Sequence, residues 1–209
     1  MEIIISDGGS KDSTLKFINT SVDRVIKHKE SFKQNISRGR NQGALNSLGD
    51  VLIFFNADTL VPDIKSFFKI VLQEFNRNNT VAVTVPIRVF PEQENISDKI
   101  FHSCYNLYVR ILNKFFFGMG RGECHIVKRD CFFKLGGYNE KIYAGEDYDL
   151  YKRLKKLGKI RFLKDVVVYE SPRRYRELGY LRVFLNWTIN SIWITLFNKS
   201  FLNEWKEIR

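Results

Sequence analysis

Cysteine is scarce in this sequence, and no internal repeat, low-complexity segment or signal peptide is evident. The three cysteines, Cys104, Cys124 and Cys131, are odd in number and include no Cys-x-x-Cys pair. This excludes a disulfide framework and a cysteine zinc site, and it indicates reduced thiols in a cytoplasmic protein. The 209 residues suffice for one sizeable domain, and the 44% hydrophobic content is that of a folded chain.

Acidic residues are in deficit. There are 23 Asp and Glu against 34 Lys and Arg, which gives a formal net charge of +11. A basic surplus suggests an anionic partner, such as a phosphorylated metabolite, nucleic acid or an acidic membrane surface, although a solvated basic surface has the same composition. The sequence contains no recognised helix-turn-helix, RNP or zinc motif. We therefore expect no nucleic acid as a partner.

Apolar strands alternate with helices along much of the chain. Short apolar runs at 3–6 and 50–55 indicate buried strands. Further strands are predicted over 22–28, 81–90 and 160–170, and helices over 37–49, 101–117 and 144–158. The last of these helices starts with acids and ends with lysines, the charge order that a helix dipole favours. Apolar residues at helical spacing predict one more helix, and they are Phe67, Phe68, Val71, Leu72 and Phe75. This alternation predicts an α/β fold with an open mixed sheet, mainly parallel, that is flanked by helices.

Polar side chains follow two of the predicted strands. Asn56 and Asp58 come after the strand at 50–55, and Asp7 ends the strand at 3–6. Because ligands of open α/β sheets bind beyond the carboxyl ends of the strands, these side chains can converge on one ligand. Carboxylates at such a place suit Mg²⁺ or Mn²⁺, which prefer oxygen ligands and bridge readily to a diphosphate. Asp and Asn are also ordinary turn formers, and this second interpretation stays open.

Three segments, in this order, resemble the family 2 glycosyltransferases of the GT-A fold. "IIISDGGSKDST" resembles the strand and Asp-Gly-Ser turn that hold the nucleotide base. "GRNQGALNSLGDVLIFFNADT" resembles the helix, strand and DxD block, and "FFKLGGYNEKIYAGEDYDLYKRLKKLGK" resembles the acceptor-side block. The resemblance implies a GT-A-like glycosyltransferase domain over 1–170, followed by a basic, aromatic, helical tail over 171–209.

The resemblance assigns the donor side of the site. It matches Asp7 to the residue that hydrogen-bonds the nucleotide base, and Arg40 to a basic residue near the base and phosphates, although a solvated helix arginine is equally compatible. Asn56 replaces the first DxD acid and is expected to contact the ribose or the sugar. Asp58 matches the metal ligand, which implies Mg²⁺ or Mn²⁺ on the diphosphate of a nucleotide-sugar donor. Many relatives have a metal-binding His after the last strand, where Glu170 is the candidate replacement.

The acceptor side is assigned to two neighbouring acids. Asp147 matches the catalytic base, and Glu146 matches a neighbour that orients the acceptor. The implied reaction is an inverting transfer, in which Asp147 removes a proton from the acceptor hydroxyl as that oxygen attacks the anomeric carbon. An acidic helix N-terminus stabilised by the helix dipole is the structural alternative, and it is compatible with a base at the same place.

The start of the chain departs from the family. Relatives normally have a further βα unit ahead of the strand at 3–6, so the resemblance implies an N-terminally truncated nucleotide-binding half. The alternative function is therefore a non-catalytic sugar-nucleotide-binding protein or partner subunit. An unpaired strand edge also favours a homo-oligomer.

The tail from Ser171 is basic and aromatic. Its segment 180–197 is too polar to predict a membrane-spanning helix. Its aromatic residues and the nearby arginines fit an amphipathic helix at the inner face of the membrane, which favours a lipid-linked acceptor such as a polyprenyl phosphate beside an ordinary hydroxyl. A helix packed on the domain, or a dimer contact, is the alternative.

Overall fold

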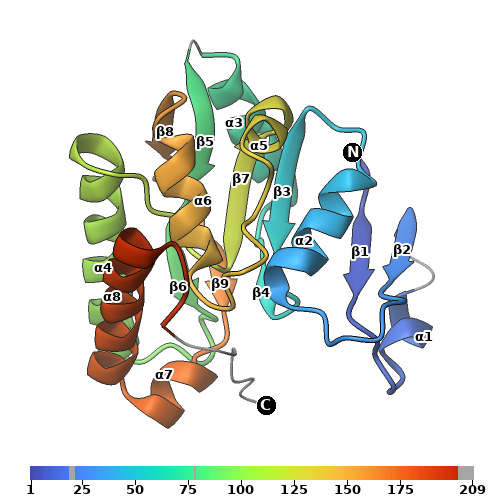
Figure 1. The fold of residues 1–209 in the computed structure, drawn as a ribbon. Helices are drawn as coiled ribbons and strands as arrows, with labels where there is room; N and C mark the ends of the chain where they lie inside the picture. The colour runs from blue at the N-terminus through green and yellow to red at the C-terminus, as the bar shows by residue number, and fades with distance from the viewer. Residues whose placement is uncertain (19–21, 78, 202–209) are drawn as a thin grey trace.

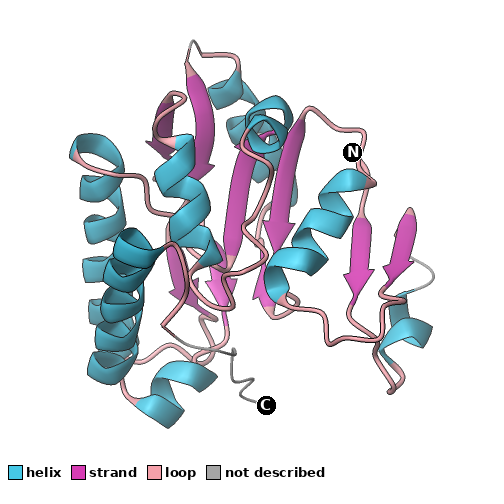
Figure 2. Ribbon diagram, viewed as in Figure 1, coloured by secondary structure: helices cyan, strands magenta, loops and turns pink. Residues whose placement is uncertain are grey.

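The computed structural model describes residues 1–18, 22–77 and 79–201. The strands are β1 (Ile4–Asp7), β2 (Arg24–Lys27), β3 (Val51–Phe55), β4 (Thr59–Leu60), β5 (Thr80–Thr84), β6 (Ile87–Val89), β7 (Cys124–Lys128), β8 (Lys159–Phe162) and β9 (Val168–Glu170). The helices are α1 (Thr14–Ile18), α2 (Ile36–Leu45), α3 (Ile64–Phe75), α4 (Ile96–Phe115), α5 (Arg129–Lys134), α6 (Glu146–Leu154), α7 (Arg173–Leu178) and α8 (Tyr180–Phe197). Helices flank the strands, which confirms the predicted α/β class (Figures 1 and 2).

The strands form three separate sheets in the described part of the chain, and the two larger sheets are mixed, as predicted. The prediction that the strands form one open, mainly parallel sheet was wrong. The largest sheet has the order β3-β7-β5-β8, and β7 runs antiparallel to both β3 and β5. The other sheets have the orders β1-β2 and β4-β9-β6. The direction of β7 follows from where it starts, beside the end of β3, where Asn56 N–H donates to Glu123 O at 3.3 Å. An apolar run in the sequence does not report this direction.

Two segments that were predicted as single strands are each divided between two sheets. Segment 81–90 forms β5 and β6, and segment 160–170 forms β8 and β9. Pro86 lies between β5 and β6 and has no N–H to give to a sheet ladder. Its carbonyl accepts a hydrogen bond of 3.1 Å from Val168, and the chain passes there from the first sheet to the second.

Apolar side chains fill both faces of the largest sheet. On one face α3 packs Phe67 and Val71 against Ile126 of β7. On the other face α5 and α6 contribute Phe132 and Leu150, and α2 lies on the same side. The start of α6 and the middle of α2 are thereby brought to the carboxyl end of β3.

The helix α8 packs on the rest of the domain, which is one of the three arrangements expected for the tail. Val183, Asn190 and Ile194 are its buried residues. Ile194 shares an apolar cluster with Tyr105 and Val109 of α4. Within the described part of the chain, every helix is too short or too polar to cross a membrane.

The strands β1 and β2 form a small parallel sheet at one side of the molecule (Figure 1). It is held to α2 by a hydrogen bond of 3.2 Å from Ser6 Oγ to Gln42 Oε1. The Glu2 carboxylate also accepts the backbone N–H groups of Leu48 and Gly49. Among the described residues, β1 pairs along one edge only, and so does β3.

Candidate active site

A cavity of about 110 Å³ lies between α2, α6 and α8. Its lining residues are Ile36, Arg40, Asn56, Tyr105, Met119, Arg121, Gly122, Glu123, Ala144, Gly145, Glu146, Asp147, Tyr148, Asn186, Trp187, Asn190 and Ser191. The structure therefore brings together Arg40, Asn56, Glu146 and Asp147, which were predicted for the site. Ligand pockets usually reach about 300–1,000 Å³, so a bound sugar nucleotide would extend beyond this cavity.

Arg40 joins three separate segments at the wall of the cavity. Its guanidinium donates to Glu146 Oε1 at 2.7 Å, to Asn56 Oδ1 at 2.8 Å and to Gly122 O at 2.7 Å. The Arg40 and Glu146 side chains are only 10% and 7% exposed, so Arg40 is not a solvated helix arginine. Burial disfavours its charged form, but the surrounding groups, Glu146 among them, outweigh burial and raise the pKa of Arg40. The charged guanidinium thus ties the end of β3 to the start of α6.

The two acids at the start of α6 are held in place by a tight turn and by α8. Gly145, just before Glu146 and Asp147, has a φ of 82°, in the left-handed region that favours glycine. A Cβ atom there would lie 2.6 Å from Asn190 Nδ2. That same amide nitrogen donates to Ala144 O at 2.8 Å. The C-terminal helix therefore supports the loop that presents both acids.

Asp147 titrates far from the usual range of a carboxyl group. Burial, and then the neighbouring Glu146 carboxylate, raise the pKa of Asp147 to about 7. Its Oδ1 atom accepts a hydrogen bond of 2.8 Å from the backbone N–H of Tyr148. A carboxyl group with a pKa near neutrality has the proton affinity that suits a general base.

Asp7 and Asp58 lie outside the cavity lining. The Asp7 carboxylate accepts hydrogen bonds from the N–H groups of Gly9 and Ser10 at 3.1 Å each and so closes the turn after β1. Burial opposes ionisation of Asp7, but these hydrogen bonds outweigh it and lower its pKa. Asp58 pairs with Arg173 at the start of α7 at 3.1 Å. The strand-end side chains therefore meet different partners in this structure.

Asp58 is the side chain to which the resemblance assigned a metal ion. No group of three or more His, Cys, Asp and Glu side chains in the described ranges is arranged to hold a metal ion. Asp58 is 48% exposed. A single exposed carboxylate fits a Mg²⁺ or Mn²⁺ ion that takes its other ligands from a diphosphate and water, and it does not fit a cage made entirely by protein.

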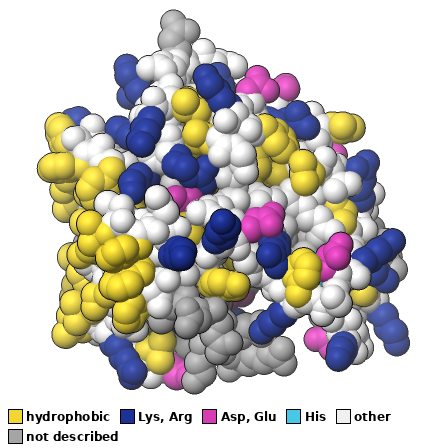
Figure 3. All heavy atoms as spheres, viewed as in Figure 1, with side chains coloured by type: hydrophobic (Ala, Val, Ile, Leu, Met, Phe, Trp, Pro, Cys, Tyr) yellow, Lys and Arg dark blue, Asp and Glu magenta, His cyan; other side chains and the backbone are white. Residues whose placement is uncertain are grey.

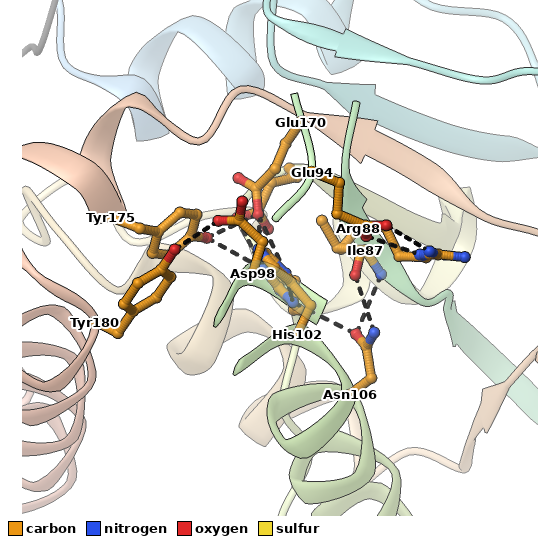
Figure 4. A network of polar contacts seen from close by, with 11 residues as sticks. Ile87, Arg88, Glu94, Asp98, His102, Asn106, Glu170, Tyr175 and Tyr180 are labelled. Carbon is orange, nitrogen blue, oxygen red and sulfur yellow. Dashed lines mark hydrogen bonds and ion pairs between the residues drawn. The ribbon is translucent and has the colours of Figure 1, made fainter. Parts of the chain in front are cut away.

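A buried polar network that was not predicted from the sequence adjoins the cavity, because its members Arg121 and Glu123 line the cavity wall. Figure 4 shows the contacts of Glu170 and Tyr175 in this network. Glu170, the candidate replacement for a metal-binding His, accepts from Tyr175 OH at 2.7 Å and from Arg121 Nη2 at 3.0 Å. Arg121 also pairs with Glu123 at 3.3 Å. Burial, and then the Glu123 carboxylate, raise the pKa of Glu170 well above its usual range. The charges of "RGE" at 121–123, next to an apolar strand, were the one sequence signal for this network.

Solved glycosyltransferases share this fold. PcManGT, the mannosyltransferase from Pyrobaculum calidifontis solved with GDP-Man and Mn²⁺, matches with a TM-score of 0.64 at 17% identity, over 88% of this chain and 54% of that one. TarS from S. aureus matches with a TM-score of 0.61 at 14% identity, over 97% of this chain and 35% of that one. TarS 1–349 in complex with UDP matches with a TM-score of 0.60 at 14% identity, over 97% and 58%. This chain thus spans 54% of the PcManGT chain, 35% of the TarS chain and 58% of the TarS 1–349 chain. At these identities the likeness shows a GT-A-like fold alone. None of the curated proteins matches the sequence.

The family assignment comes from the sequence match. The model of the family described as "Glycosyl transferase family 2" matches residues 1–145 of the 209. The matched range contains Asp7, Arg40, Asn56 and Asp58, and it ends just before Glu146. Because the match covers more than half of the chain, the chain belongs to glycosyl transferase family 2.

Proposed function

We propose that this chain is an inverting, metal-dependent glycosyltransferase that moves a sugar from a nucleotide-diphosphate donor to a hydroxyl or phosphate acceptor. The observation that carries the proposal is the position of Asp147 on the cavity, with a pKa raised to about 7, next to the Arg40–Glu146 ion pair. Family membership supports the reaction class. The GDP-Man and UDP bound to proteins of similar fold support a nucleotide-sugar donor.

On the donor side, Asp7 is proposed to hold the base, and Asn56 the ribose or sugar. Arg40 was expected near the base and phosphates. Its hydrogen bonds to Asn56, Glu146 and Gly122 O support a different role. We assign Arg40 as a positioning residue, which fixes the amide of Asn56 relative to the acids of α6.

On the acceptor side, Asp147 is the proposed base and Glu146 its orienting neighbour. The acceptor oxygen forms a bond to the anomeric carbon while the bond from that carbon to the diphosphate oxygen breaks. The nucleoside diphosphate leaves with the electron pair, and the acceptor proton passes to the Asp147 carboxylate. Attack from the side opposite to the leaving group inverts the configuration at the anomeric carbon.

Asp58 would hold the Mg²⁺ or Mn²⁺ ion, which when bound neutralises negative charge on the leaving diphosphate. The partner that Asp58 has now, Arg173, is 50% exposed. Exposed ion pairs of this kind contribute only about 0–1 kcal/mol, so exchanging Arg173 for a metal ion costs little. Asp58 therefore remains available to a donor that arrives with its cation.

The acceptor is proposed to be a hydroxyl compound or a polyprenyl phosphate, with the chain on the cytoplasmic side of a membrane. The α8 residues Asn186, Trp187, Asn190 and Ser191 form one wall of the cavity. These amide and hydroxyl groups beside an indole ring suit an acceptor with both polar and apolar parts.

The stereochemistry of the reaction tests the proposal. GDP-mannose and UDP-glucose are each incubated with the protein and Mn²⁺, and the anomeric proton of the first product is followed by NMR. We expect the product to have the configuration opposite to that of the donor. Retention of configuration would contradict the inverting mechanism. Donor binding without consumption, with water and with all acceptors tried, would favour the non-catalytic alternative.

A further inference from the structure

The helix α8 carries an exposed apolar stripe that no packing within the described chain covers. The stripe consists of Leu181, Leu185, Ile189, Ile192 and Leu196. These residues follow one another at intervals of three or four, so they lie on one side of the helix. Each is between 48% and 71% exposed. The stripe lies away from the side of α8 that is buried against the domain.

The helix α4 carries a second stripe of the same kind. It consists of Ile96, Ile100, Leu107, Ile111 and Phe115, each between 40% and 77% exposed. We call the ten residues of the two stripes the α4/α8 face. Large exposed apolar surfaces usually mark a site of interaction with a partner or a membrane.

The two helices are locked side by side, so the α4/α8 face is one surface. Tyr105 of α4 packs on Phe184 and Trp187 of α8, with ring centroids 6.2 Å and 5.4 Å apart. Near the start of both helices, Asp98 accepts a hydrogen bond of 2.7 Å from Tyr180 OH (Figure 4). Both helices run in the same direction (Figure 1). Hydrophobic side chains gather on this flank of the molecule (Figure 3).

The exposed charges carried by α4 and α8 themselves are all positive. Lys99, Arg110 and Lys114 are exposed on α4, and Arg182 is exposed on α8. The one acid in the two helices, Asp98, is fully buried. The face therefore combines aliphatic stripes with a basic border.

An anionic membrane surface matches both features. Interfacial helices bury their apolar side at the boundary of the acyl chains and place Lys and Arg at anionic headgroups. The helices α4 and α8 have 20 and 18 residues, and neither is apolar enough to cross the bilayer. A second copy of the chain fits less well, because a two-fold contact through this face sets the basic borders of the two copies against each other.

We infer that the α4/α8 face docks the protein on an anionic membrane surface, with both helices lying in the plane of the interface. The sequence indicated such a contact for the tail alone, and the structure adds α4. On a neighbouring side of α8, Asn186, Trp187 and Ser191 line the cavity. Docking therefore holds the cavity beside the membrane, which suits an acceptor carried by a lipid. This last step rests on the proposed function.

The test is co-sedimentation with vesicles of neutral phosphatidylcholine and with vesicles that contain phosphatidylglycerol. Binding is expected to the anionic vesicles only and to weaken as salt is raised, because the basic border is screened. The double variant Leu185→Glu with Ile189→Glu should lower the partition coefficient at least about tenfold, since each change removes apolar burial and adds like charge. The matched control is Leu72→Glu on α3, because Leu72 is 51% exposed and Leu185 is 48% exposed. The control should bind as the wild type does.

Absence of wild-type binding to anionic vesicles would overturn the inference. Equal loss of binding in the Leu72→Glu control would overturn it as well. A wild-type dimer that becomes a monomer in the double variant would assign the face to a second copy instead. Circular dichroism confirms that each variant is folded. GDP and UDP affinities are measured in parallel, so a failure of membrane docking is distinguished from a failure of the proposed function.

Discussion

Arg40 and Glu146 form a buried ion pair, in which Nη1 lies 2.7 Å from Oε1. The same guanidinium donates to Asn56 at 2.8 Å. One side chain therefore fixes the distance between the end of β3, where Asn56 is proposed to contact the donor, and the start of α6, where the proposed base lies. The ion pair with Glu146 explains why Arg40 of α2 stays charged although it is buried at the cavity wall.

Removing Arg40 should destabilise the protein strongly. Arg40→Ala leaves the Glu146 carboxylate buried without its partner, and we expect a loss of about 3–5 kcal/mol in the free energy of unfolding. The double variant Arg40→Met with Glu146→Gln removes both charges and should recover much of this loss. Urea denaturation measures the free energy of unfolding of Arg40→Ala and of the double variant.

The matched control is Arg38→Ala, whose ion pair with Glu140 is 36% and 47% exposed. This variant should cost no more than about 1 kcal/mol. Equal losses of unfolding free energy in Arg38→Ala and Arg40→Ala would show that the buried ion pair stabilises the protein no more than the exposed pair does. The single variants Arg40→Met and Glu146→Gln are measured as well. If their effects add up to that of the double variant, the two side chains do not stabilise each other, and the same conclusion follows.

The helices could be predicted from the sequence because their signals are local. Periodic apolar residues identified most of α3, and the acid-to-base charge order identified α6. The prediction of 101–117 for α4 missed its first turn, which begins at Ile96. The missed signal was also local, since Asn95 and Asp98 form a capping box that starts the helix.

Strand partners and buried networks could not be predicted, because they depend on contacts that are distant in the sequence. Nothing in "CHIVK" shows that β7 lies between two strands that run the other way. The strand-end rule grouped Asn56, Asp58 and Asp7, but only Asn56 lines the cavity. The strand that Asp7 ends belongs to a different sheet. Glu170 meets Arg121 only after the chain has folded, whereas the family resemblance had suggested a metal site for it.

The raised pKa of Asp147 predicts a pH dependence of stability. In the unfolded chain this carboxyl ionises near its ordinary value of 3.8, and in the folded protein it ionises at about 7. Between these values the folded state holds a proton that the unfolded state has lost, so the free energy of unfolding falls as pH rises from about 4 to about 7. Asp147→Asn should lose this component, as measured by urea denaturation at a series of pH values. Identical pH dependence in both proteins would contradict the raised pKa.

The metal assignment predicts that Mn²⁺ strengthens nucleotide binding. Wild-type affinity for GDP or UDP should be higher with Mn²⁺ than with EDTA, and Asp58→Ala should abolish the difference while the fold is kept. Arg173→Ala frees the Asp58 carboxylate and should preserve the Mn²⁺ effect. Isothermal titration calorimetry gives the affinities. Equal wild-type affinity in Mn²⁺ and in EDTA would remove the metal from the account.

The small β1-β2 sheet should open before the largest sheet does. Every residue of β5 is buried, whereas only Asp7 is buried in β1. Few buried contacts mean that local opening costs little free energy. Hydrogen exchange should therefore be faster at the amides of β1 and β2 that pair within their sheet than at those of β5. Equal protection of the two sheets would show that the protein unfolds as one unit.

The most direct test of the central claim is the rate of donor cleavage by Asp147→Asn, measured with saturating nucleotide sugar and with water as the acceptor, so that no acceptor needs to be identified. The substitution keeps the size of the side chain but removes its ability to take a proton. We expect the rate to fall by about 10²- to 10⁴-fold while the affinity for the donor stays within about twofold of the wild type. The control variant Asp165→Asn, on the exposed loop after β8, should cleave the donor at the wild-type rate. A wild-type rate in Asp147→Asn would show that this acid only starts a helix, and the proposed mechanism would be wrong.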